Sequence, residues 1–505
     1  MAHIVIPPIR RLLARWGVHP DARKYPAAGL ASLDAGLPPQ LVVSLSQQAG
    51  APARPVVRVG DHVLRGALLA EASGAVSAPL HAPTSGTVIA IGDAPMAHPS
   101  GLPGAAITLR PDGLDQWGER IGHPYPITLS PEEIAGRVSA AGIVGMGGAA
   151  FPSALKLSLG KRSNIDTVIL NGSECEPYLS CDDRLMQECA ADIIEGARLI
   201  LRATGATRLL VGIEDNKPEA INAMKIAAHP YPEVSVIRMP SRYPMGSERQ
   251  LIHTLTGIEP PAGGRSADVG VVAHNVGTAL AVYRALRHGE PLTERLVTVA
   301  GGAVTSPRNL RVRIGTPLSW LFAQCGGLRS VPARLVVGGP MMGVGVSDVD
   351  IPVGKGTSGV LALTPAEVGE REPAACIRCG SCVTACPVGL MPLEMAARIN
   401  ANELGKAEDI GLGDCLTCGA CGFVCPSRIP LVQYFAHARG ELRARDRDRQ
   451  RLERVRQLTE ARAERIERAA REKAEMHARR KAERAAAAEA QARAKEKAET
   501  EENPA

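Results

Sequence analysis

The sequence has few aromatic residues and no long uncharged apolar run. Phe, Trp and Tyr make up 3% of its 505 residues, so the core should consist mainly of aliphatic side chains. The best candidate for a membrane span, residues 267–286, carries Asp268, His274 and Arg284, so no membrane-spanning helix is expected. The net charge of +6 is modest, and without a basic, aromatic-rich patch it argues against nucleic-acid binding.

The beginning of the chain lacks the pattern of a secretory signal. Residues 1–17 show no basic region followed by an apolar stretch and a small-residue cleavage site. Eight of the 12 cysteines lie within two short repeats instead of being spread over the chain. These features favour a reducing, cytoplasmic setting over a disulfide framework.

The two cysteine repeats share one spacing. "CIRCGSCVTACP" begins at Cys376 and "CLTCGACGFVCP" begins at Cys415. Both follow C-x2-C-x2-C-x3-C-P, the run of bacterial ferredoxins in which the fourth cysteine ligates the other cluster. The spacing predicts two [4Fe–4S] clusters, one held by Cys376, Cys379, Cys382 and Cys425 and the other by Cys415, Cys418, Cys421 and Cys386. Structural zinc is the alternative, but zinc does not explain the third C-x2-C step or the prolines.

Short alternating strands with glycine turns are predicted over residues 56–92. The phrases "VGDHV" and "APTSGTV" resemble a biotinyl/lipoyl-type barrel-sandwich domain. Such domains carry a modified lysine in the hairpin between the two phrases, and here that hairpin reads "AEASGAVSAPL". The sequence therefore predicts a small β scaffold without an attached cofactor.

A glycine cluster follows a predicted helix whose start at Ser130 has the capping-box pattern. Glycines allow a backbone to approach a phosphate, and a helix N-terminus behind them favours an anion. The cluster is neither a GxGxxG fingerprint nor a Walker A motif, and a lone glycine cluster is more often a turn. The residues concerned are Gly145, Gly147 and Gly148, with Lys156 in the helix-like run that follows.

Polar residues leave the end of the next predicted strand, in "TVILNGSECEP". Asn171, Glu174 and Glu176 stand where open α/β sheets place their ligand contacts. Further strands are predicted in "ATRLLVGIED" and "VSVIRMP", separated by the helix-like "KPEAINAMKIAAH". The alternation predicts an α/β domain with a ligand at this edge.

Four phrases carry a family resemblance: "GMGGAAFPSALKL", "NGSECEPYLSCDDRLM", "YPMGSERQLI" and "HNVGTALAV". With the two ferredoxin motifs, they resemble the RnfC/RsxC subunits of Rnf (Rsx) ion-translocating electron transport complexes. More distantly, they resemble the flavin-bearing NADH-oxidising subunit of respiratory complex I. The resemblance covers about residues 1–440.

A multidomain α/β architecture is implied. It comprises an N-terminal region with a β barrel-sandwich hybrid (1–125), a Rossmann-like FMN and NAD(H) domain (126–290), a β-grasp, SLBB-type domain (291–365) and a bacterial 2[4Fe–4S] ferredoxin-like domain (366–440). Residues 441–505 are rich in Ala, Arg, Glu and Lys, and residues 441–502 contain no glycine or proline, which predicts a charged helical tail. The tail is either a solvated extension or a docking helix for a membrane-bound partner.

The resemblance also assigns roles to individual residues. Gly145, Gly147, Gly148 and Lys156 would cradle FMN. Asn171, Glu174, Asn275 and Thr278 would contact the flavin. Phe151, Glu176 and Glu248 would line the nicotinamide approach. The chain departs from the complex I pattern at Met146, Ser173 and Ser247. No catalytic acid, base or nucleophile is required.

The implied function is that of a peripheral subunit on the cytoplasmic side of the bacterial inner membrane. It would pass electrons between NAD(H), FMN and two [4Fe–4S] clusters, as part of a ferredoxin:NAD+ oxidoreductase of the translocase class. Its partners would be ferredoxin or flavodoxin and membrane subunits that couple the flow to ion translocation. Two alternatives stay open: a non-catalytic electron-relay adaptor and a soluble NADH-dependent reductase subunit of related fold.

Overall fold

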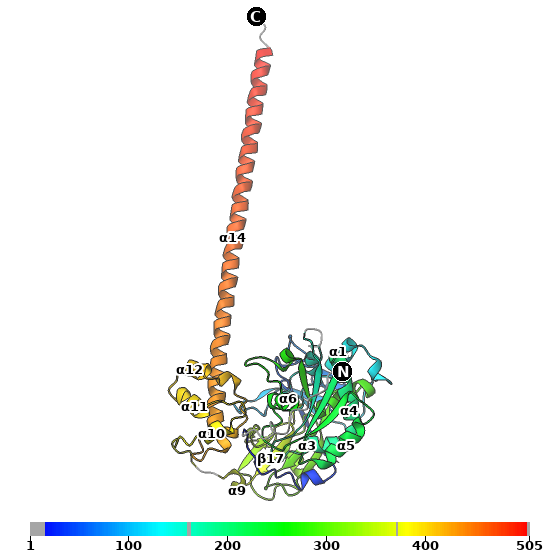
Figure 1. The fold of residues 1–505 in the computed structure, drawn as a ribbon. Helices are drawn as coiled ribbons and strands as arrows, with labels where there is room; N and C mark the ends of the chain where they lie inside the picture. Colours follow the sequence, from blue (N-terminus) through cyan, green and yellow to red (C-terminus); the bar gives the residue numbers. More distant parts are fainter. Residues whose placement is uncertain (1–15, 159–162, 370–371, 502–505) are drawn as a thin grey trace. The chain divides into compact units, whose positions relative to one another are not determined.

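The computed structural model describes residues 16–158, 163–369 and 372–501 (Figure 1). The chain divides into two compact units, Met1–Phe435 and Ala436–Ala505. The first unit contains three β-containing regions and a helical cysteine-rich region. The mixed α/β architecture with a C-terminal helix confirms the predicted fold class.

The first β region is a sandwich of two antiparallel sheets. One sheet has the order β2-β8-β7-β4 and the other β3-β5-β6. Their inner faces share one aliphatic core that includes Leu41, Leu69 and Ile107. The strands are β2 (Leu41–Ser44), β3 (Arg54–Pro55), β4 (His62–Val63), β5 (Leu68–Glu71), β6 (Leu80–His81), β7 (Gly86–Ala94) and β8 (Gly104–Pro111).

The second β region is a parallel sheet with the order β11-β10-β9-β12. Its strands are β9 (Thr167–Gly172), β10 (Arg208–Glu214), β11 (Val234–Met239) and β12 (Val271–Asn275). The register pairs Asn171 with Asn275, so both side chains leave the same carboxyl edge. This edge is where open parallel sheets place their ligand contacts.

Helices cover both faces of this sheet. Along β9, Val168 and Leu170 share a core with α1, α4, α5 and α7, whereas Ile169 packs with α6 on the other face. The helices are α1 (Pro131–Ala140), α2 (Ser153–Leu157), α3 (Cys181–Glu188), α4 (Ala190–Thr204), α5 (Pro218–Ala228), α6 (Glu248–Thr256) and α7 (Val276–His288). The predicted capping box of α1 is confirmed, because the Glu133 N–H donates to Ser130 Oγ and the Ser130 N–H donates to Glu133 Oε2.

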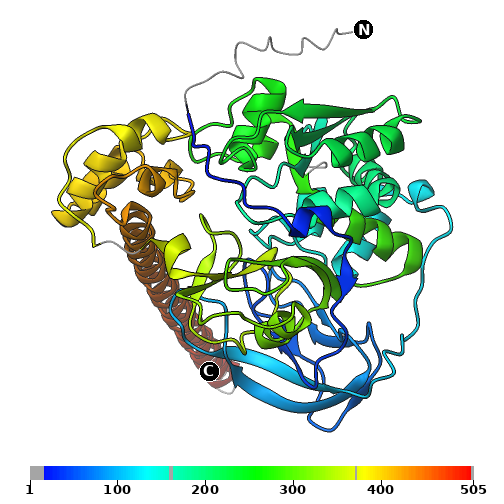
Figure 2. The same cartoon turned by 90° about the horizontal axis from the view of Figure 1, so that it is seen from below.

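The third β region is a mixed sheet with the order β1-β14-β13-β17-β15-β16. Its elements are β1 (Leu33–Asp34), β13 (Glu294–Ala300), β14 (Arg308–Arg313), β15 (Arg334–Val337), β16 (Val344–Val346), β17 (Gly359–Leu363) and α8 (Leu318–Gln324). The edge strand β1 pairs in parallel with β14, so residues near the N-terminus complete this later sheet (Figure 2). The sequence grouped this early segment with the barrel-sandwich, because nothing local marks a strand pairing across almost 280 residues.

A buried lysine joins the three β regions. Lys355 follows β16, and its Nζ donates to the carbonyl oxygens of Pro79 (2.8 Å) and Gly142 (2.6 Å). Its backbone N–H donates to the side chain of Gln47 at 2.9 Å. Burial lowers the pKa of Lys355 to about 7, so the contact favours a neutral amine compared with an exposed lysine.

Short helices surround the cysteine repeats. They are α9 (Pro365–Val368), α10 (Ser381–Ala385), α11 (Pro392–Asn400), α12 (Leu404–Asp409) and α13 (Ala420–Phe423). The last helix, α14 (Leu431–Glu501), begins earlier than the predicted tail and spans the boundary between the two units. From residue 445 to residue 497 every side chain is exposed, and pairs such as Arg456–Glu460 connect successive turns. Across the described residues, no helix has the length and apolarity to span a bilayer.

Candidate functional site

The glycine loop is anchored at both ends and open in the middle. The Gly145 N–H donates to the Phe151 carbonyl oxygen (2.8 Å), and the Met146 N–H donates to Thr278 Oγ1 (2.9 Å). Within the described residues, the backbone N–H groups of residues 147–149 have no protein acceptor. A Cβ added at Gly148, where φ is +106°, would meet no atom within 4 Å. The loop therefore offers successive free N–H donors facing space, which fits a phosphate.

Two asparagines mark the carboxyl edge of the parallel sheet. Asn171 Nδ2 donates to the Gly246 carbonyl oxygen at 2.9 Å. Asn275 Oδ1 accepts the Gly277 N–H at the start of α7, and Asn275 Nδ2 donates to Asp182 Oδ2 at 2.6 Å. Both predicted contact residues thus lie at this edge, held by the loops around it.

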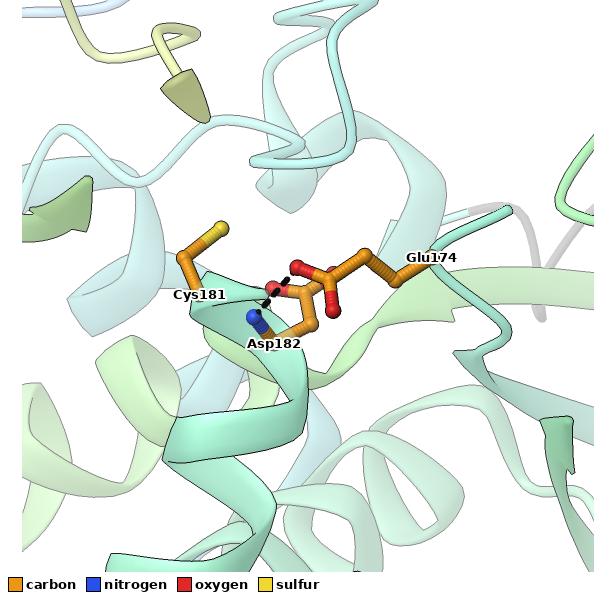
Figure 3. A group of neighbouring side chains, drawn as sticks. All are labelled: Glu174, Cys181 and Asp182. Carbon is orange, nitrogen blue, oxygen red and sulfur yellow. Dashed lines mark hydrogen bonds between the residues drawn. The ribbon is translucent and has the colours of Figure 1, made fainter. Parts of the chain in front are cut away.

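Figure 3 shows the acidic group beside Asn275. Glu174 caps α3, because its carboxylate accepts the N–H groups of Asp182 (2.8 Å) and Asp183 (3.2 Å). Burial, and then the charge of Glu174, raises the pKa of Asp182 to about 7. Ligand atoms of Glu174, Cys181 and Asp182 lie within 4.8 Å of one another, but these groups already serve the helix cap and Asn275. We regard them as part of the sheet-edge site.

Lys156 and Glu248 form an ion pair next to this edge. Lys156 Nζ lies 3.2 Å from Glu248 Oε2 and donates to the Ala273 carbonyl oxygen at 3.1 Å. The Ser266 hydroxyl donates to the other Glu248 oxygen. The structure thus brings together a residue expected near the flavin and one expected near the nicotinamide.

Glu176 is engaged by a loop of the third β region. Its carboxylate accepts the N–H groups of Met341 (3.0 Å) and Met342 (2.9 Å). Burial raises the pKa of Glu176 to about 7, although both amide donors oppose this shift. A Cβ at Gly339 would lie 2.3 Å from the carboxylate, so the close approach depends on glycine.

The cysteines gather around two cavities. Cys376, Cys379, Cys382 and Cys425 line a cavity of about 200 Å³, and Cys386, Cys415, Cys418 and Cys421 line one of about 20 Å³. In each repeat, the second residue after the first cysteine has a left-handed backbone and donates its N–H to that cysteine's sulfur. These residues are Arg378 (φ 55°) and Thr417 (φ 52°), both at 3.4 Å. The groups match the crossed sets that the sequence predicts, and four thiols around one cavity fit a cubane cluster.

The two cavities differ in exposure. Cys376 and Cys379 are exposed, whereas Cys418 and Cys421 are buried. The buried group contacts the sheet-edge region directly: the Tyr243 hydroxyl donates to the Cys418 carbonyl oxygen at 2.5 Å, and Gln250 Nε2 donates to the Pro387 carbonyl oxygen at 2.8 Å. We name the first group the outer cysteine cavity and the second the inner cysteine cavity.

Sequence reasoning missed three buried residues at this site: Lys24, Lys217 and Tyr243. Lys217 follows the end of β10, a position that could have marked it as a sheet-edge group. Lys24 and Tyr243 have no such local signal. Of the remaining thiols, Cys325 is buried as predicted, and burial raises its pKa to about 11.

The fold and this site define a class of protein: an electron-transfer protein that holds FMN and two [4Fe–4S] clusters. Family models agree region by region. They match the RnfC barrel-sandwich hybrid domain at residues 13–114, the Nuo51 FMN-binding domain at 138–284, the SLBB domain at 296–345 and a 4Fe–4S dicluster domain at 369–426.

Among curated proteins, the chain is 48% identical to the RnfC protein of the ion-translocating oxidoreductase complex from Rhodobacter capsulatus. The match spans 87% of this chain and 85% of that protein. It is 42% identical to the protein of the same name from Erwinia tasmaniensis, over 90% of this chain and 56% of the longer relative. The chain therefore belongs to the RnfC family of ion-translocating oxidoreductase complexes, and the predicted resemblance is confirmed.

Among solved structures, an NAD+-reducing [NiFe]-hydrogenase matches with a TM-score of 0.44 and 19% identity, over 57% of this chain and 59% of that one.

Proposed function

We propose that this chain is the peripheral subunit through which an ion-translocating membrane complex exchanges electrons with NAD(H), on the cytoplasmic side of the membrane. In this role it would act in a ferredoxin:NAD+ oxidoreductase, with ferredoxin or flavodoxin and the membrane subunits as its other partners. Its relatives are named as parts of an ion-translocating oxidoreductase complex, which supports this assignment.

The observation that carries the proposal is one short turn, residues 243–246. At one end, the Gly246 carbonyl oxygen accepts the amide of Asn171, a sheet-edge residue. At the other end, the Tyr243 hydroxyl donates to the carbonyl oxygen of Cys418, which lines the inner cysteine cavity. The same turn thus contacts both the flavin-site edge and a cluster cysteine.

FMN supplies the conversion between a hydride, which carries two electrons, and clusters that carry one. The residues present fit this cofactor: the free N–H groups of residues 147–149 would hold its phosphate, with Lys156 nearby. Asn171, Asn275 and Thr278 would fix the edge on which the ring lies. Phe151 and Glu248 would border the nicotinamide approach, and Glu176 would act there through the 338–343 loop that it holds.

The difference in exposure gives the two cavities different roles. The inner cysteine cavity, beside Tyr243, would exchange electrons with the flavin, and the outer one would exchange them with a partner protein. The exposed Cys376 and Cys379 support this order, because electron transfer between proteins needs a cluster near the surface.

Anaerobic purification with iron, sulfide and flavin quantification tests the proposal, followed by NADH addition monitored by visible absorbance and EPR. We expect flavin bleaching together with reduced-cluster signals. Intact clusters without flavin and without a response to NADH would contradict the proposal and favour an electron-relay adaptor.

A further inference from the structure

A buried lysine from the N-terminal segment grips the loop that carries Glu174. Lys24 is only 8% exposed, and its ammonium donates to the backbone carbonyl oxygens of Glu174 (2.9 Å), Glu176 (3.0 Å) and Leu179. All three ammonium donors therefore have acceptors, none of which is a charged side chain. Accordingly, burial lowers the pKa of Lys24 below its usual value.

A second buried lysine grips the same loop from the sheet. Lys217, at the start of α5, is 1% exposed, and its Nζ donates to the Ser173 carbonyl oxygen at 2.6 Å. Its other acceptors are Glu214 Oε2 (3.1 Å) and Asn216 Oδ1 (2.9 Å). Burial opposes the charge of Lys217, but the neighbouring carboxylates, Glu214 first, hold its pKa above the usual value. Lys217 is therefore a charged donor at neutral pH.

The two lysines fix the direction of two peptide groups. In a trans peptide the N–H points opposite to the C=O. Since the Ser173 carbonyl points to Lys217 and the Glu174 carbonyl points to Lys24, the N–H groups of Glu174 and Cys175 point away from the lysines. In the part of the chain that the structure describes, neither N–H has a protein acceptor, and the buried Ser173 hydroxyl also has no partner.

The backbone of this loop needs such external support. Glu174 has φ of 46° and Tyr178 has φ of 67°, left-handed conformations that are uncommon for residues other than glycine. The N-terminal segment also holds the far end of the loop, because the Tyr178 N–H donates to the Ala22 carbonyl oxygen at 2.8 Å and Arg23 donates to the Tyr178 hydroxyl at 3.0 Å. Unsatisfied buried N–H groups are costly, so a loop held in this form indicates a ligand that accepts from them.

We propose that Lys24 and Lys217 are positioning residues of the flavin site, which present the N–H groups of Glu174 and Cys175 to acceptor atoms of the isoalloxazine ring. This inference rests on the proposed flavin site. The donors would strengthen as the reduced ring gains negative charge, so they would favour the reduced flavin. The two lysines thus connect the N-terminal segment and α5 to the redox behaviour of a cofactor that neither lysine touches.

The first test compares Lys24→Met and Lys217→Met with Lys225→Met, an exposed lysine on the same helix as Lys217. We expect each buried variant to bind FMN about tenfold more weakly, the equivalent of one lost hydrogen bond with a charged group. Riboflavin should weaken by the same factor, since the ring and not the phosphate is affected. The midpoint potential of the bound flavin should shift to more negative values, while Lys225→Met and iron content stay unchanged. FMN affinity and potential equal to those of Lys225→Met in both variants would overturn the proposal.

A second test needs no variant and stays informative if a buried substitution prevents folding. Hydrogen exchange of the unmodified chain is compared with and without FMN, with readout of the Glu174 and Cys175 amides. Strong slowing of both amides on FMN binding is expected, and unchanged exchange with FMN bound would refute the inference alone. Absence of FMN binding to the unmodified chain would instead refute the proposed flavin site.

Discussion

Replacement of Cys425 by alanine should remove the cluster of the outer cysteine cavity and leave the one beside Tyr243 in place. Cys425 belongs to the second repeat, but its side chain lines the cavity of Cys376, Cys379 and Cys382. In the reciprocal variant, Cys386→Ala, the inner cysteine cavity loses its fourth thiol although the other three come from the second repeat. Each variant thus removes the cluster of the opposite repeat.

The expected magnitude follows from two clusters of four irons each. Iron and sulfide should fall from about eight to about four per chain in either variant, with roughly half the visible cluster absorbance. The surviving clusters should differ in access. The cluster left in Cys386→Ala is bordered by the exposed Cys376 and Cys379, whereas the one left in Cys425→Ala is bordered by the buried Cys418 and Cys421.

The assay combines anaerobic iron analysis with oxidation by ferricyanide, a large anion that reaches exposed clusters first. The cluster of Cys386→Ala should bleach faster than that of Cys425→Ala, and NADH should reduce the cluster of Cys425→Ala more readily. Cys325→Ala, which removes a buried thiol outside both cavities, is the matched control and should keep about eight irons. If the two variants exchanged these behaviours, each repeat would hold its own cluster and the crossed arrangement would be wrong.

Three further predictions concern other contacts. Tyr243→Phe should keep flavin and iron but lose the bond to the Cys418 carbonyl; we expect a loss of about 1–3 kcal/mol in unfolding free energy and slower cluster reduction by NADH in stopped-flow traces, with flavin reduction unchanged. Because burial lowers the pKa of Lys355 to about 7 from 10.5, the unfolded chain binds more protons between these values, so unfolding free energy should rise by about 2 kcal/mol from pH 7 to pH 9; urea titrations should show that Lys355→Met loses this rise. Deletion of residues 441–505 should leave cofactor content intact, and membrane association unchanged by the deletion would exclude the docking-helix hypothesis for the tail.

Features that depend on local sequence could be predicted. The capping box at Ser130 involves residues three apart, and the cysteine spacing reflects how one short loop wraps a metal cluster. The positions of Asn171 and Asn275 followed from the rule that parallel strands place polar residues at a common carboxyl edge. In each of these cases, the physical constraint acts within a few residues or within one sheet.

Contacts between distant segments could not be predicted in the same way. Lys24 meets its carbonyl partners about 150 residues away, and a lone lysine in a polar segment ordinarily indicates a solvated side chain. Glu174 shows the opposite difficulty: it lies at the expected edge, but its carboxylate caps α3, which motif position does not reveal. A motif identifies the residues of a site more readily than it identifies their partners.

The contacts of Glu176 and Tyr243 show why the third β region matters for electron transfer although it offers no cofactor ligand of its own. Its 338–343 loop gives two N–H donors to Glu176 at the flavin-site loop. The same loop lies against the inner cysteine cavity, since a Cβ at Gly419 would come within 2.9 Å of the Met341 carbonyl oxygen. A change in either contact would alter the separation between flavin and cluster, and electron transfer depends steeply on that separation. The loop is therefore best understood as a spacer that fixes this separation, and selection for glycine at positions 339 and 419 would follow from the lack of room for any side chain.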